Sequence, residues 1–368
     1  MAASVVEGFD ARRFVKEHWQ RQPALFRNAR PDFDPAIDGN DLAALACHED
    51  AQARLVLGPD DRGRWAVEYG PFNDDRFASL PPENWTLLVQ DVDKWDPAVG
   101  ALLTDFRFLP DWRLDDIMVS FAVDGGSVGP HWDHYDVFLL QAAGHRRWSI
   151  DAAPAPELEA RPDSELKLLR RFTPTDTWTL GPGDMLYLPP GVPHHGVAVG
   201  DCLTWSVGLR APSAGELLVD FAESRSEALD EALRLTGDAA GDHPARIDPA
   251  VVHRARELVT AAAAADEATF TRWLGGFLTR YRLPDAADGL VESPSDTHQQ
   301  VRCPWSRWAF VEDGDRANLF VNGTAYACSA AFARTVTATP IIARAALDTG
   351  DPADATTLEA LLEAELLR

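Results

Sequence analysis

The chain has 368 residues, 46% of them hydrophobic and 25% charged, which excludes global disorder and allows two domains or one large and one small domain. Its 58 acidic and 34 basic residues give a net charge of −24, so we expect a basic partner rather than nucleic acid or a membrane surface. The first residues lack the apolar run of a signal peptide, and no segment is long and apolar enough for a membrane span, which predicts a cytoplasmic protein.

The residues between about 117 and 210 are predicted to form a series of short strands. They contain apolar runs rich in β-branched and aromatic residues, separated by turns with glycine, proline and aspartate. The expected strands cover residues 117–123, 136–141, 146–150, 177–180, 184–189 and 203–209. Strands that follow one another without intervening helices favour a β-sandwich or barrel over alternating βαβ units.

From about residue 211 the apolar residues repeat with the period of a helix. Ser213 and Glu216 have the spacing of a capping box, which predicts a helix over about 213–235. Asp248 followed by Pro249 predicts the start of a second helix, and Asp266 that of a third. Three helices between two β-containing regions indicate a helical domain that packs on the rest of the chain or on a second copy, and we expect a homodimer.

The last part of the chain is predicted to be a small α+β domain. Asn322-Gly323 between two apolar runs is a strong signal for a two-residue hairpin turn, and leucines repeat along a closing helix at about 355–367. Domains with a helix and a hairpin of this size often have a winged-helix shape, which suits nucleic-acid binding. Residues 296–368 hold ten acidic residues against six arginines, so we expect no direct binding of nucleic acid.

Histidines are concentrated in the β-rich region, where five of the ten lie between positions 131 and 195. His131 and Asp133 are two residues apart, so in a strand both side chains point to one face. A histidine of the run Pro193-His194-His195 offers a third ligand after a turn and a strand. Two histidines and one carboxylate form the facial triad of Fe(II) oxygenases, which leaves coordination positions for a 2-oxo acid and dioxygen.

Other interpretations of this triad stay open on the residues alone. An isolated His-x-Asp pair usually lies on a surface, and a cupin-type barrel also holds Mn or Zn without oxygenase activity. A basic residue helps to separate these readings, because the distal carboxylate of 2-oxoglutarate needs a fixed cation. Strand alternation places Arg146 on one face with Trp148 and Ile150. Arg147 then faces the other way, so Arg146 is the better candidate.

Three segments of this region resemble the bacterial ribosomal oxygenases of the JmjC (cupin-type) superfamily: GPHWDHYDVFLLQAAGHRRWSI, LGPGDMLYLPPGVPHHG and LTWSVGLRAP. FVKEHWQRQPALFRNA near the start and NWTLLVQDVDKW at 84–95 extend the resemblance over nearly the whole chain. It implies a mixed α+β fold whose core, within residues 1–210, is a double-stranded β-helix (jelly roll). It also implies a helical dimerisation domain at 211–290 and a small winged-helix-like domain at 291–368.

The resemblance carries over to the proposed metal ligands. His131, Asp133 and His194 resemble the three iron ligands of the family. The family typically has Pro-His-Glu where this chain has Pro-His-His, so His195 is a competing ligand. We assign His194 because its offset from the Pro-Pro-Gly turn fits, and we expect His195 to point outward or to lie behind the ligands.

The resemblance also implies a cosubstrate pocket and a reaction. Arg146 would bind the 2-oxoglutarate carboxylate, and Ser120 and Ser206 would line the pocket. The implied enzyme is an Fe(II)- and 2-oxoglutarate-dependent dioxygenase. It uses O2 to hydroxylate an arginine side chain of a large-subunit ribosomal protein of the sixteen type, and it releases succinate and CO2. Asp124 and Asp136 are candidates for contacts with that arginine, although a purely structural role is the simpler interpretation of each.

Alternatives from the same superfamily and from another class of protein complete the hypotheses. The iron ligands are shared with histidyl hydroxylases and methyl-lysine demethylases, so they do not decide the substrate. A non-enzymatic cupin-type protein that contacts nucleic acid through its C-terminal domain is disfavoured by the acidic charge of that domain and by the combination of the triad with Arg146.

Overall fold

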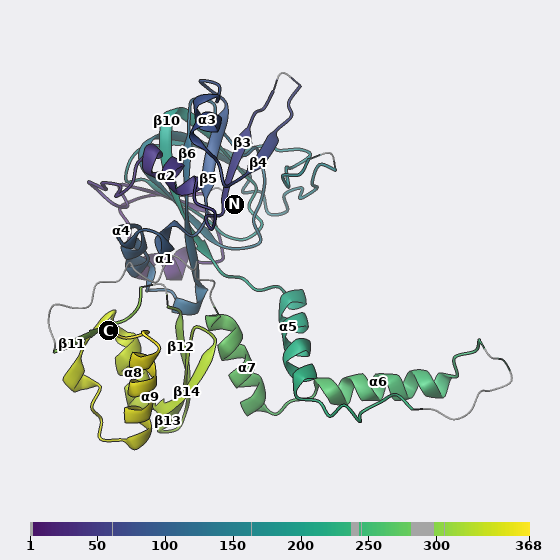
Figure 1. Ribbon diagram of the computed structural model, residues 1–368. Coiled ribbons are helices and arrows are strands. Elements are labelled where there is room, and N and C mark those ends of the chain that lie inside the picture. The colour runs from purple at the N-terminus through teal and green to yellow at the C-terminus, as the bar shows by residue number, and fades with distance from the viewer. Residues whose placement is uncertain are drawn as a thin grey trace.

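A computed structural model describes residues 3–60, 62–162, 164–236, 243, 245–280, 298–304 and 306–368 of the chain. Ten strands form one large sheet in the order β1-β2-β9-β7-β10-β6-β5-β3-β4, and β8 also pairs with β7 (Figure 1). These strands are β1 (Ser4–Glu7), β2 (Ala24–Arg27), β3 (Ala53–Leu57), β4 (Ala66–Tyr69), β5 (Trp85–Val89), β6 (Leu114–Ala122), β7 (Val137–Ile150), β8 (Asp176–Leu180), β9 (Met185–Leu188) and β10 (His194–Leu209).

The two faces of this sheet have separate apolar cores because side chains alternate along each strand. On β7, Phe138 and Leu140 belong to a large core with residues of the N-terminal helices, whereas Val137 and Leu139 belong to a second core with Trp148. We call the face of the second core the inner face. All five of these side chains are at most 5% exposed, and burying each one contributes about 1.5–3 kcal/mol to folding.

Short helices cover the face opposite the inner face. They are α1 (Ala11–Glu17), α2 (Gly39–Ala46), α3 (Asp74–Ala78) and α4 (Pro97–Ala101), with the 3₁₀ turns η1 (Val92–Lys94), η2 (Leu102–Phe106) and η3 (Asp111–Arg113). Asp38 and Asp41 form a capping box that starts α2, and Phe14 of α1 is fully buried in the large core. The η1 turn packs against β6, and η3 leads directly into that strand.

The strands of the β-rich region are fewer and longer than the sequence predicts. Residues 136–141 and 146–150, expected as two strands, form the single strand β7, and the strand expected at 203–209 begins at His194. Gly144 explains the first difference, because its φ of +62° produces a bulge rather than a chain reversal. A Cβ at Gly144 would lie 2.1 Å from the carbonyl oxygen of Asp201 on the paired strand, so only glycine fits.

Three helices follow β10 and begin where the sequence predicts. They are α5 (Ala214–Glu227), α6 (Pro249–Ala263) and α7 (Glu267–Thr279), and Ser213, Asp248 and Asp266 accept hydrogen bonds at their N-termini. The first helix ends at Glu227 rather than near residue 235, and Asp230 then accepts from the backbone N–H of Ala232 in a local turn. Figure 1 shows α6 extending away from the remainder of the molecule.

The C-terminal part contains two helices, a two-stranded sheet and a three-stranded sheet. Its elements are β11 (Gln299–Val301), β12 (Trp308–Asp313), β13 (Arg316–Val321), β14 (Thr324–Ser329), α8 (Ala330–Ala338), β15 (Ile341–Ala343) and α9 (Pro352–Glu363). The predicted hairpin is confirmed, because β13 and β14 pair in antiparallel register across Asn322-Gly323. The closing helix begins three residues earlier than predicted, at Pro352 behind the N-cap Asp351. Helix α7 packs on this sheet, and Gly275 leaves room for the ring of Phe320.

Within the described residues, no helix combines the length and the apolar character that a membrane crossing needs. The predicted boundary between the helical and C-terminal domains, at residues 290 and 291, lies outside the described residues.

Candidate metal and cosubstrate site

His131 and His194 are held opposite each other by their own backbones. The N–H of His131 donates to the carbonyl oxygen of His194 at 3.0 Å, and the reverse bond measures 2.8 Å. His194 is the first residue of β10, whereas His131 lies in the segment that precedes β7. The backbone N–H of Gly191 donates to the carbonyl oxygen of Asp133, which fixes the third residue against the same turn. The three residues are therefore positioned by main-chain hydrogen bonds.

The protonation of the two imidazole rings suits metal binding. Nδ1 of His131 lies 2.9 Å from the carbonyl oxygen of Gly129, and Nδ1 of His194 lies 2.9 Å from that of Val192. Because a carbonyl only accepts, each Nδ1 carries the hydrogen and each Nε2 keeps its lone pair. Burial lowers the pKa of His194 to about 4, with the neighbouring His131 acting in the same direction, so the ring is neutral near pH 7.

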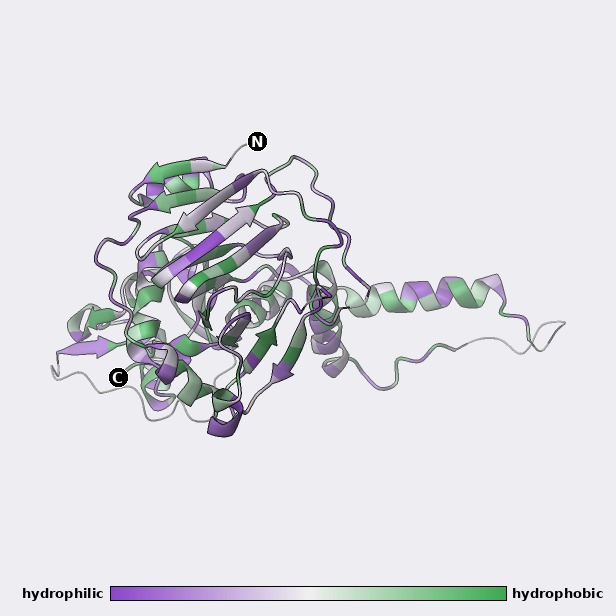
Figure 2. Ribbon diagram, turned by 90° about the horizontal axis from the view of Figure 1, so that it is seen from above, coloured by the Kyte–Doolittle hydropathy of each residue, from purple (hydrophilic) through white to green (hydrophobic). Residues whose placement is uncertain are grey.

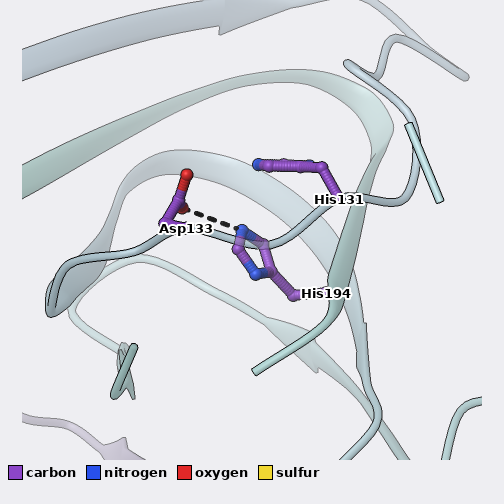
Figure 3. A group of neighbouring side chains, drawn as sticks. All are labelled: His131, Asp133 and His194. Carbon is purple, nitrogen blue, oxygen red and sulfur yellow. Dashed lines mark ion pairs between the residues drawn. The ribbon is translucent and has the colours of Figure 1, made fainter. Parts of the chain in front are cut away.

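Asp133 completes a cluster with the geometry of a three-residue metal site. Its carboxylate oxygen lies 3.5 Å from Nε2 of His194, and one ligand atom from each of His131, Asp133 and His194 lies within 4.8 Å of the others. Figure 3 shows the three side chains pointing toward one space from two segments of the chain. Two imidazoles and one carboxylate that face one space are the donor set that suits Fe(II) with open positions.

His195, the competing candidate, points elsewhere. Its Nε2 lies 3.0 Å from the hydroxyl of Ser127, and Phe172 packs edge-on against its ring. Successive residues of a strand face opposite sides, which separates its side chain from that of His194. Burial lowers the pKa of His195 to about 4, so this ring is also neutral near pH 7.

Arg146 lies buried on the inner face of β7, with Trp148 beside it and Arg147 exposed on the opposite face. Its guanidinium donates to the hydroxyls of Ser120 at 3.1 Å and Thr204 at 3.2 Å. Burial lowers the pKa of Arg146. No acidic side chain of the described residues forms an ion pair with its guanidinium, and its Nε has no hydrogen-bond partner. A buried guanidinium with unused donors is a site for a carboxylate from a bound molecule.

The uncharged polar side chains around Arg146 come from three adjacent strands. Ser120 of β6 and Gln141 of β7 both stand opposite Thr204 of β10, so the three side chains share the inner face. Thr204 donates to the side-chain oxygen of Gln141 at 3.2 Å, which orients its hydroxyl. Ser206 lies two residues further along β10, buried on the same face. Thr204 and Gln141 could not be identified from the sequence, since only the strand register brings them beside Arg146.

A carboxylate that no sequence motif marks lies near the start of β6, before Ser120. Asp116 shares the inner face with Ser120 by strand alternation, and its Oδ1 would be 3.0 Å from a Cβ at Gly208 of β10. Burial, together with Asp91 and other acidic neighbours, raises its pKa to about 7. Burial, followed by the nearby carboxylates of Asp133 and Asp116, raises the pKa of Tyr135. The three side chains therefore lie in one neighbourhood.

The two carboxylates considered for substrate contact have structural roles. Asp136 is fully buried on the other side of the strand, where it accepts hydrogen bonds from the hydroxyl of Tyr187 and the amide of Gln20. Asp124 accepts from the backbone N–H of Gly200 at 2.8 Å and stabilises a turn. Both carboxylates are thus engaged by groups distant in the sequence, which favours the structural role for each, and contact with a substrate arginine stays a prediction.

Comparison with known proteins places this site in a family. Residues 101–217 match the JmjC domain family. The Escherichia coli protein named ribosomal protein uL16 3-hydroxylase is 37% identical over 276 residues, which cover 73% of this chain and 71% of that protein. The JmjC match includes the complete His-Asp-His cluster and Arg146.

Solved structures extend the similarity to almost the whole chain. The crystal structure of Escherichia coli YcfD superposes with a TM-score of 0.77 at 30% identity and covers 98% of both chains. A structure of YcfD described as a ribosomal oxygenase in complex with cobalt and 2-oxoglutarate gives a TM-score of 0.75 with the same coverage. The JmjC (cupin-type) fold with mixed α and β content, expected from the sequence, is confirmed. The chain belongs to the ribosomal oxygenase family of JmjC-domain proteins.

Proposed function

We propose that this protein is an Fe(II)- and 2-oxoglutarate-dependent oxygenase that hydroxylates an arginine side chain of the large-subunit ribosomal protein uL16, with release of succinate and CO2. The observation that carries the proposal is the His131, Asp133 and His194 cluster on the same inner face as a buried Arg146 that has no acidic partner among the described residues. Bound Fe(II) supplies the oxygen activation that couples oxidation of the 2-oxo acid to insertion of one oxygen atom into a C–H bond.

The chain contributes binding and orientation to this reaction. His131 and His194 present their Nε2 lone pairs, and Asp133 presents a carboxylate oxygen, to one metal ion. Arg146 binds the distal carboxylate of 2-oxoglutarate by a charge-assisted hydrogen bond. Ser120, Thr204 and Ser206 line the cosubstrate pocket, and the first two hold the guanidinium in place. The inner-face leucines and Trp148 exclude water around this ion pair and strengthen it.

The environment of Asp116 favours a substrate with a guanidinium group. Asp116 forms no ion pair with a described basic side chain, and burial, followed by the neighbouring carboxylates of Asp91, Asp93 and Asp115, raises its pKa to about 7. An arginine of the substrate would supply the missing positive charge and favour the ionised carboxylate. Tyr135, adjacent to this carboxylate and 43% exposed, provides an aromatic face for the same side chain. The net charge of −24 supports attraction of a basic ribosomal protein.

In this proposal, residues 1–210 form the catalytic domain. Residues 211–290 form a helical dimerisation domain, and residues 291–368 form a winged-helix-like domain. Apolar residues of α5 and α6 support a second copy of the chain as partner, because Leu218, Val252 and Val259 are 58–69% exposed. Figure 2 shows hydrophobic residues distributed along the projecting helix α6. A ribosomal substrate also supports a location in the cytoplasm.

Mass spectrometry of the candidate substrate tests the proposed function. Purified ribosomal proteins are incubated with the full chain, Fe(II), 2-oxoglutarate and ascorbate, and intact masses are compared with a reaction that contains the Asp133→Ala variant. A gain of one oxygen atom on uL16 alone, located on arginine by fragmentation, is the expected result. Oxygen on a histidine, or loss of a methyl group from lysine, would identify one of the alternative activities. Absence of both succinate and a mass gain would contradict an oxygenase.

A further inference from the structure

An arginine of the C-terminal part reaches across to the first residues of β6. Arg307, immediately before β12, is 4% exposed and its Nε donates to the carbonyl oxygen of Leu114 at 2.9 Å. Its Nη2 donates to the carbonyl oxygen of Asp115. That carbonyl belongs to the peptide unit that Asp115 shares with Asp116, so the guanidinium restrains the backbone at the point where the side chain of Asp116 begins.

The backbone of Arg307 is itself fixed by the hairpin that the sequence predicts. Its N–H donates to the side-chain oxygen of Asn322 at 2.8 Å, and the N–H of Asn322 donates back to the carbonyl oxygen of Arg307. Asn322 has a φ of +47° in the turn between β13 and β14. This reciprocal pair holds the base of the arginine side chain rigidly relative to the C-terminal sheet.

Neighbouring contacts restrain the same stretch of β6. Asp93 of η1 is 2% exposed, accepts from the backbone N–H of Ile117 at 2.8 Å, and lies 4.0 Å from Nη2 of Arg307. The backbone N–H of Asp91 donates to the carboxylate of Asp116 at 3.0 Å. Asp91, the residue before η1, thus contacts Asp116 directly, and the guanidinium of Arg307 lies beside the buried carboxyl group of Asp93.

A second buried arginine strengthens the junction. Arg302 donates to the carboxylate of Asp111 at 2.9 Å, in the η3 turn that leads into β6, and its guanidinium lies over the ring of Trp308. Burial lowers the pKa of Arg302 to about 10, so the residue stays charged near pH 7. Two arginines of the C-terminal part therefore bind residues that precede Asp116 in the sequence.

From this geometry we propose that Arg307 is a positioning residue for substrate binding. It holds the start of β6 so that Asp116 faces the substrate arginine, and through it the C-terminal domain sets the affinity for uL16. The inference rests on the proposed function, in which Asp116 receives the substrate guanidinium. Misplacement of a binding group by about 1 Å is sufficient to cost a large factor in activity, so loss of Arg307 has a functional consequence although it does not touch the substrate.

A double-mutant cycle separates positioning of Asp116 from a general structural role. Steady-state hydroxylation of purified uL16 is measured for the full chain, Arg307→Met, Asp116→Asn and the double variant, and the KM for 2-oxoglutarate is measured in parallel. Arg334→Met is the matched control, because Arg334 is an exposed arginine of the same domain that pairs with Glu312. Arg307→Lys keeps the charge but lacks the planar pair of donors.

If Arg307 acts through Asp116, Arg307→Met raises the KM for uL16 about tenfold, more than it raises the KM for 2-oxoglutarate, and Arg307→Lys has a smaller effect. In the Asp116→Asn background the same change then costs less than about twofold. An equal loss in both backgrounds would overturn the proposal. Should Arg307→Met fail to fold, Arg307→Lys decides by the same cycle.

The cycle also distinguishes failure of this inference from failure of the proposed function. An unchanged KM for uL16 in Asp116→Asn would remove Asp116 from substrate binding, and the role of Arg307 with it. A raised KM in Asp116→Asn together with an uncoupled Arg307 would leave the substrate site intact and overturn only the positioning role. Absence of uL16 hydroxylation by the unmodified chain would refute the proposed function itself.

Discussion

The site on the inner face of the large sheet is buried within one chain, whereas the projecting helices α5 and α6 leave apolar side chains exposed. Around the metal cluster, His194 is 3% and Arg146 is 5% exposed, and the strands that carry them are paired on both sides. On the helices, Leu218 and Val259 are 67% and 69% exposed. The large sheet therefore forms the site from the residues of one chain, whereas α5 and α6 leave apolar surface that a second molecule would cover.

This contrast predicts that the reaction depends on the inner face, whereas association with a second copy of the chain depends on α5 and α6. Removal of a group from the inner face should destroy metal or cosubstrate binding, since no solvent or neighbouring side chain replaces it. Changes on the exposed helices should affect association and leave the barrel chemistry largely intact. The expected effects below decrease in size from the metal cluster to the helices.

The largest loss is expected from Asp133→Ala. Removal of the only carboxylate in the cluster leaves two imidazoles, which do not hold Fe(II) in a facial arrangement, so 2-oxoglutarate turnover should be abolished. Succinate formation and bound iron are measured together, with circular dichroism to establish that the variant is folded. Asp313→Ala, at an exposed position of β12, is the control. Retained turnover in Asp133→Ala would show that the cluster is not the metal site.

The next largest effect distinguishes the two faces of β7. Arg146→Ala should raise the KM for 2-oxoglutarate about a hundredfold, since loss of one partner of a buried charge pair costs about 2–5 kcal/mol. Arg147→Ala, on the exposed face of the same strand, should leave this KM within about twofold of the original value. The measurement is succinate formation against cosubstrate concentration. Equal effects of the two substitutions would mean that Arg146 does not bind the cosubstrate.

The site residues that could be predicted from the sequence are those linked by local spacing. His131 and Asp133 share a face because they are two residues apart, and Arg146 follows from strand alternation in the next segment. The turn before His194 directs that residue rather than His195 toward the cluster. Much of the secondary structure could be predicted for the same reason, because turns, helix caps and strand alternation each depend on a few neighbouring residues.

The remaining site residues depend on the pairing of distant strands. Asp116 joins the site through the register of β6 with β10, and Arg307 contacts β6 across 192 positions of sequence. The structural role of Asp136 has its particular partners for a related reason, since Tyr187 and Gln20 lie far away in the chain and could not be named from the sequence. Two predicted strands merged into β7 because a bulge at Gly144 and a turn look alike in sequence.

A smaller effect is expected from pH. Because the pKa of Asp116 is raised to about 7, the carboxylate gains its charge as pH rises from 6 to 8, while a substrate arginine stays protonated throughout. The KM for uL16 should therefore fall by about tenfold over this range. Asp116→Asn should remove most of this pH dependence. Initial rates against uL16 concentration at several pH values provide the measurement, and an equally steep profile in the variant would assign the titration to another group.

The smallest effect on chemistry, and the largest on assembly, is expected from the helices. Val259→Glu places a charge among the exposed apolar residues of α6, so it should convert a dimer of the chain into single copies by weakening the apolar contact. Succinate formation without uL16 should change by less than about twofold, since the barrel is complete within one chain. Sedimentation velocity reports the mass, and Thr260→Glu, exposed at the next position, is the control. If the unmodified chain sediments as a single copy, the exposed apolar helices serve a different partner, and the division of roles between barrel and helices then requires a new interpretation of α6.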